Sequence, residues 1–151
     1  MAVAAKLYGK SMEHFVKGEI AFLTDACKVM LMVSAYAFNQ DLHNSRADVV
    51  ANEVATGAGY TARGATLVTK SVTYDATLNR TRLFSDPTFW TPPAGQSLTA
   101  RHAIIYKDSS TDASSWLMGY IDLGVSVTAT GSPLTLSWDV TDGLLYVDVA
   151  V

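Results

Sequence analysis

The chain has 151 residues, of which 49% are hydrophobic and 17% charged, and its formal net charge is −3. That length fits one domain with a core of its own, and the lack of a lysine and arginine cluster argues against nucleic acid as a partner. The low charged fraction leaves much neutral and apolar surface, which favours a protein partner or an oligomer. We therefore expect one β-rich domain over residues 1–151.

The N-terminal residues 1–10 are small and apolar, and they predict either an ordered strand or an N-terminal arm. They contain no adequate secretory signal, so we expect a soluble protein made in the cytoplasm. The longest nearly uncharged apolar segment, 29–38, is too short to cross a bilayer. Cys27 is the one cysteine and lies in an apolar run, which predicts a buried side chain rather than a reactive thiol.

A short helix is predicted within the next segment, limited to two or three turns by Gly9 and Gly18. Its apolar face would be formed by Leu7, Met12, Phe15, Val16 and Ile20. His14 would then lie on its polar side, among the charged residues.

The rest of the chain has the pattern of β-strands separated by turns. The predicted strands are 28–35, 68–74, 80–84, 98–107, 116–123, 125–130, 134–138 and 144–149. Strands so short and so regularly spaced are typical of an antiparallel β-sandwich or a small barrel. With one short N-terminal helix packed on the sheets, the fold class is mainly β, a β-rich α+β domain.

Two turn signals indicate how the predicted strands are connected. Asp142-Gly143 lies between two apolar runs and predicts a hairpin joining 134–138 to 144–149. Pro87 on one side and Pro92-Pro93 on the other bracket Phe89 and Trp90, which predicts an edge or a loop. Two large aromatic side chains there would be costly to expose, so we predict that Phe89 and Trp90 contact another protein subunit.

Gly57, Gly59 and Gly64 punctuate a polar run of small residues. The run lacks the third glycine of a dinucleotide-binding fingerprint and the Gly-Lys-Ser/Thr of a P-loop, and no helix pattern follows it. The glycines therefore predict turns or bulges with positive φ rather than a phosphate site.

No constellation for catalysis or tight metal binding is present in the sequence. His14, His43 and His102 have no metal-ligand spacing, and no GxSxG elbow occurs. Asp108 and Asp112 flank a predicted turn, where aspartate is favoured by hydrogen bonds to its own backbone. A calcium ion near Asp41 and Asp48 is left open, although their spacing is not that of an EF-hand. We assign no catalytic, cofactor or metal-binding residue and do not expect an enzyme.

The aromatic residues on the predicted strands allow two interpretations. Core packing with cross-strand aromatic pairs is the simpler one. A carbohydrate-binding platform is the alternative.

The order of segments resembles a family of small virion structural proteins of tailed bacteriophages. The segments that carry the resemblance are MVSAY (32–36), ANEV (51–54), GAGYT (57–61), GATL (64–67), SVTYDA (71–76), ARHAIIYKD (100–108), GYIDLG (119–124), LTLSWD (134–139) and GLL (143–145). They extend over nearly the whole chain and include no catalytic signature.

The resemblance implies a protein that works by binding other virion proteins. The role it favours is a capsid decoration, or cement, protein on the head surface, trimeric and bound to the major capsid protein. The N-terminal residues 1–10, with Leu7 and Tyr8 as candidate contacts, would reach a neighbouring subunit. The alternatives are a tail, baseplate or fibre-associated protein and a carbohydrate-binding host-recognition module.

Overall fold

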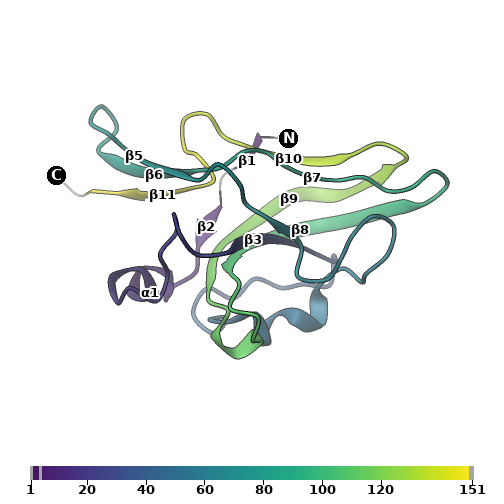
Figure 1. Ribbon diagram of the computed structural model, residues 1–151, viewed down its shortest axis with the longest axis horizontal. Helices are drawn as coiled ribbons and strands as arrows, with labels where there is room; N and C mark the ends of the chain where they lie inside the picture. The colour runs from purple at the N-terminus through teal and green to yellow at the C-terminus, as the bar shows by residue number, and fades with distance from the viewer. Residues whose placement is uncertain (1, 4, 150–151) are drawn as a thin grey trace.

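The computed structural model describes residues 2–3 and 5–149, and Figure 1 shows their arrangement. One short helix, α1 (Ser11–Val16), accompanies strands that form three sheets. The strands are β1 (Ala2–Val3), β2 (Lys6–Leu7), β3 (Cys27–Met32), β4 (Ala65–Thr66), β5 (Ser71–Asp75), β6 (Arg80–Phe84), β7 (Thr88–Trp90), β8 (Ser97–Lys107), β9 (Leu117–Thr130), β10 (Leu134–Trp138) and β11 (Leu145–Asp148). The predicted mainly-β class with one short helix is confirmed.

The sheets form two layers. A five-stranded sheet, β2-β9-β8-β3-β4, is faced by two three-stranded sheets, β11-β6-β5 and β1-β10-β7, which lie side by side in Figure 1. Among the described strands, β1 pairs with β10 in parallel, and the other pairs are antiparallel. Of the two predicted architectures, this layered arrangement is that of a sandwich.

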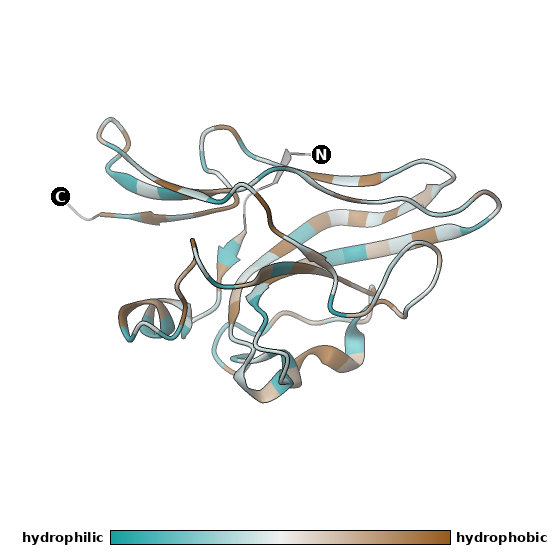
Figure 2. Cartoon of the chain, viewed as in Figure 1, coloured by the Kyte–Doolittle hydropathy of each residue, from teal (hydrophilic) through white to brown (hydrophobic). Residues whose placement is uncertain are grey.

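The main core lies between the layers. Alternation along β3 sends Val29 and Leu31 into it, together with Ile105 of β8 and Ile121 of β9. Residues of β6, β7, β10 and β11 close it from the opposite layer. Figure 2 shows the matching pattern of apolar residues along β3, β9 and β10.

A second, smaller core covers the other face of the same sheet. Met30, Met32, Ile104 and Tyr106 point into it, and the segment after β3 supplies Tyr36 and Val49 as a lid. That segment contains the 3₁₀ turns Arg46–Asp48 and Val50–Asn52. Because both faces of the sheet are buried here, residues 29–32 of β3 form a continuous apolar run.

The predicted strand positions are largely confirmed, and the bounds of β6 and β10 agree with the prediction. The predicted segments 116–123 and 125–130 are one long strand, β9. The 68–74 segment begins later than predicted, at Ser71.

The predicted Asp-Gly hairpin is wrong. β10 pairs with β7 and β1, whereas β11 pairs with β6. The chain turns at Asp139–Gly143, where the Gly143 N–H donates to the Asp139 carbonyl at 2.8 Å. The next N–H, of Leu144, donates to the Leu83 carbonyl at 2.9 Å and so directs β11 into the neighbouring sheet.

The described part of the predicted N-terminal arm is built into the domain. β1 pairs with Ser137 and Trp138 of β10, and β2 pairs with Gly119 and Tyr120 of β9. Residues 1 and 4, which the prediction included, lie outside the described part.

Candidate protein-interaction surface

Helix α1 is attached to the domain by polar side chains. The Ser11 hydroxyl lies 2.8 Å from the Met118 carbonyl and 3.1 Å from that of Leu117. His14 is buried, stacked on Trp116 with ring centroids 4.3 Å apart. Its ring nitrogens lie 2.6 Å from a Glu19 carboxylate oxygen and 2.8 Å from the Asn44 side-chain oxygen.

The predicted orientation of this helix is therefore wrong. Ser11 and His14 face the protein, while Met12 is 39% and Val16 82% exposed. Of the five residues predicted for the apolar face, Ile20 lies in the core and Leu7 and Phe15 pack against it, but Leu7 and Ile20 lie outside α1. The polar contacts just described hold α1 in place and leave apolar side chains outside.

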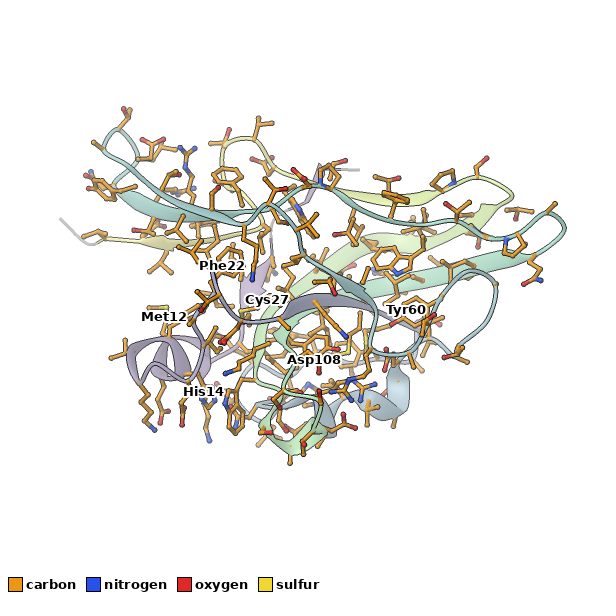
Figure 3. The ribbon with its side chains drawn as sticks, viewed as in Figure 1. Met12, His14, Phe22, Cys27, Tyr60 and Asp108 are labelled. Carbon is orange, nitrogen blue, oxygen red and sulfur yellow. The ribbon has the colours of Figure 1, made fainter. Side chains whose placement is uncertain are left out.

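An apolar groove lies between α1, the following loop and the sheet β11-β6-β5. Its volume is about 580 Å³. Met12 and Phe15 of α1 line one side and Phe22 and Leu23 of the loop another. Figure 3 shows Met12 and Phe22 on this side of the molecule, above α1.

The sheet forms the remaining wall of the groove. Val72 of β5, Leu83 of β6 and Val147 of β11 all face it. At the rim, Leu23 is 56% and Val72 42% exposed. Apolar side chains of this size, gathered around one hollow and exposed to water, make this groove the candidate interaction surface of the described residues.

The opposite face of the same small sheet is charged. Arg80 stacks on the Tyr146 ring with 4.1 Å between guanidinium and centroid, and it pairs with Asp142 and Asp148. Arg82 pairs with Asp75 at 3.3 Å. The two faces of β11-β6-β5 thus differ in chemistry: the outer one carries paired charges, and the inner one lines the apolar groove.

The structure separates the residues predicted as contacts. Phe89 is 63% exposed on β7, and Leu7 is half-buried at the groove. Trp90 is buried in the core near Tyr60, and Tyr8 is buried with its hydroxyl 2.7 Å from that of Tyr36. Trp90 and Tyr8 therefore have no surface to offer a partner, and the proposed Phe89–Trp90 pair is corrected to Phe89 alone.

The reason is the alternation of β7. Of the two predicted alternatives, an edge or a loop, the edge is the correct one, because β7 is the edge strand of the sheet β1-β10-β7. In this strand Thr88 and Trp90 point inward and Phe89 outward. The same fact removes half of the aromatic platform that a carbohydrate site at this position would need.

The glycine run is structural, as predicted. Gly57 and Tyr60 exchange backbone hydrogen bonds of 2.9 Å, with positive φ at Ala58 and Gly59 between them. A Cβ at Gly64, whose φ is +71°, would overlap the Val29 carbonyl oxygen. Only glycine lets this loop approach β3 so closely.

A network of charges missed from the sequence holds this loop. The carboxylate of Glu53, itself 4% exposed, pairs with Arg46 and accepts from the Tyr60 hydroxyl at 2.7 Å and the Arg63 N–H at 2.5 Å. Arg63 extends across to Asp108, 2.5 Å away, and to Asp112 at 2.7 Å. Figure 3 shows Asp108 below β3, on the side covered by the segment that follows this strand.

Asp108 was predicted as a turn residue, and it does accept the Ser110 N–H at 3.0 Å. Its main partners are distant, however, because Lys28 lies 2.7 Å from its second oxygen. Burial raises the pKa of Asp108, but the hydrogen bonds from Arg63 and Lys28 outweigh burial and hold its pKa far below the usual range. The carboxylates of the network are paired within the chain, and Arg46 Nε is buried without a hydrogen-bond partner.

The other two histidines also have structural partners. His43 Nδ1 lies 3.0 Å from the Tyr36 hydroxyl, and His102 Nδ1 lies 2.9 Å from that of Tyr120. Burial, followed by the charge of Arg101, lowers the pKa of His102. Within residues 2–3 and 5–149, no three His, Cys, Asp or Glu side chains are gathered as a metal would require. The Asp48 carboxylate accepts hydrogen bonds from the backbone N–H groups of Asn44 and Ser45.

Comparison of the chain with protein-family models, with curated proteins and with solved structures finds no match. In the described part of the chain, none of the helices combines the length and the apolar composition that crossing a bilayer requires. The resemblance to phage virion proteins remains a prediction from the sequence.

Proposed function

We propose that the protein is a bacteriophage virion component, a capsid decoration protein that binds the assembled head through the apolar groove beside α1. The groove is the observation that supports this role best. Its rim residues Met12, Leu23 and Val72 are apolar and solvent-exposed, which suits a site completed by another protein.

Such binding would stabilise the head by mass action. A protein that binds only the expanded shell lowers the free energy of that state by an amount that grows with its free concentration. The rigid sandwich beneath the groove suits this task, because a preformed surface loses little conformational freedom on binding. The major capsid protein is the proposed partner, and the head surface the proposed location.

The test is binding to expanded, undecorated heads of the phage that encodes the chain. We expect the purified protein to co-sediment with heads and saturate at a fixed copy number. Leu23→Gln and Met12→Gln should each weaken binding about tenfold, because each places an amide where an apolar contact forms. Val140→Gln is the matched control, since Val140 is 87% exposed and lies outside the groove.

Retention of full binding by both groove variants would contradict the role of the groove. The same surface would also serve a tail or baseplate protein. Electron cryomicroscopy of the virion separates the two locations, and density for the chain on the tail alone would overturn the capsid proposal.

A further inference from the structure

We propose that β5 is the site where a second copy of this chain adds its own β5, antiparallel, about a two-fold axis through Thr73. The two small sheets would then join into one continuous sheet across the pair. This inference deepens the proposed function, since it names copies of the chain as partners, but its test needs no capsid.

The first argument is the length of the free edge. Among the described strands that end a sheet, β1, β2 and β4 have two residues each, β7 has three and β11 four, whereas β5 has five. β7 is also flanked by prolines. Short strands, prolines, lysines and bulges are how proteins keep edges from pairing, and β5 contains none of them.

The second argument is the unused backbone of this edge. β5 pairs with β6 in an unbroken register from Ser71↔Phe84 to Asp75↔Arg80. Its backbone groups make no hydrogen bond to any other described segment. In Figure 1 the β5–β6 hairpin projects at one end of the molecule, with nothing drawn beyond β5. A second strand can therefore approach without displacing another element.

The third argument is that the sequence of β5 is complementary to itself. With Thr73 facing its own copy, each Val72 lies opposite a Tyr74, and each Ser71 opposite an Asp75. The register sets an aromatic ring against a β-branched side chain, a favourable cross-strand pair, and brings no like charges together. Asp75 also keeps its own Arg82 as a counter-ion.

The fourth argument is the side on which these residues lie. Val72 lines the groove, and Tyr74, two positions along the strand, faces the same side. The two are 42% and 56% exposed in the single chain. Antiparallel addition would place the second copy's Tyr74 beside Val72 at the groove rim, so one occupant covers both the free edge and the exposed apolar residues next to it.

The test uses a cysteine at the two-fold axis. Directly opposed residues in an antiparallel pair have Cα atoms about 4.5–5.5 Å apart, within the range a disulfide spans. A mild oxidant that removes two electrons and two protons should therefore link Thr73→Cys to a second Thr73→Cys chain. Cys27 is fully buried and does not compete. Thr135→Cys, exposed on the central strand β10, is the matched control.

We expect Thr73→Cys to give covalent dimers at least tenfold faster than Thr135→Cys at equal protein concentration. Sedimentation of the reduced wild type should show a concentration-dependent dimer, and Thr73→Asp, which sets two carboxylates face to face, should shift it to monomer with unchanged circular dichroism. Equal or absent cross-linking in the two cysteine variants, or a wild type that stays monomeric or forms a trimer, would overturn the proposal. Neither result bears on capsid binding, which is measured separately.

Discussion

The two sides of this molecule differ in whether their side chains find partners within the chain. On the loop-covered side of β3, Glu53, Arg46 and Arg63 are paired with one another or with Asp108 and Asp112. Beside α1, apolar residues such as Leu23 and Val72 are left in water around a groove. The charges of the first side are paired within the chain, whereas the apolar residues of the second are exposed as on a surface that a partner would cover. If this contrast is correct, substitutions on the charged side must lower the free energy of unfolding much more than substitutions in the groove.

The largest loss of stability is expected for Glu53→Ala. The change leaves the Arg46 guanidinium, 4% exposed, without its buried counter-ion. Breaking a buried pair from one side costs about 3–5 kcal/mol in the free energy of unfolding, measured by urea denaturation. Glu13→Ala is the control, because Glu13 pairs with Lys17 in full solvent and should change little. Equal effects of the two substitutions would break the comparison.

Gly64→Ala should be the next most costly. Its left-handed φ and the Val29 carbonyl beside it both oppose a side chain, so we expect a loss of at least about 2 kcal/mol. Gly18 has nearly the same φ, +73°, but nothing lies near its missing Cβ. Gly18→Ala should therefore cost only about 1 kcal/mol, and the difference between the two thermal unfolding curves isolates the close approach to β3.

Acid should weaken the charged side specifically. Asp108 has a pKa in the folded state below its value of about 3.9 in an unfolded chain. Its stabilising contribution is thus complete above about pH 4 and is lost as the pH falls toward the folded pKa. Asp108→Asn should cost about 1–2 kcal/mol at pH 7 and reduce the slope of stability against pH between about 4 and 2, followed by urea unfolding. An unchanged slope would contradict the assignment.

The smallest change in stability is expected for a substitution in the groove. Leu23→Gln should alter the free energy of unfolding by less than about 0.5 kcal/mol, because this side chain is already largely in water. A loss above about 1.5 kcal/mol would mean that Leu23 belongs to the core and that the groove is not a free surface. The expected result sharpens the comparison, since a stable variant that loses binding assigns the residue to a partner.

Much of the fold follows from local sequence. The alternation of apolar and polar residues is a property of each strand by itself, and it located β6 and β10 with their observed ends. Partner choice is not local. Asp142-Gly143 has the chemistry of a hairpin turn, but the bond from Leu144 to Leu83 joins residues far apart in the chain and decides where β11 pairs.

The interaction surface was predictable only in part. Phe89 was found because prolines bracket it, whereas the burial of Trp90 follows from the pairing of β7 with β10, which brings alternate side chains of β7 into the core. The groove escaped prediction because Ser11 and His14, both polar, turn inward and reverse the apparent face of α1. The signal that was present is Val16, an apolar residue among charged ones that no core contact explains.

The parallel pair formed by β1 and β10 sets the order in which the domain can be completed. Ala2 and Val3 are synthesised long before their partners in the sheet, Ser137 and Trp138. β2 likewise pairs with residues made much later, Gly119 and Tyr120. Closing such long loops is entropically costly and slow, so β1 can pair only after β10 has been made. Until then, the emerging chain carries unpaired strand backbone that cellular chaperones would be expected to shield.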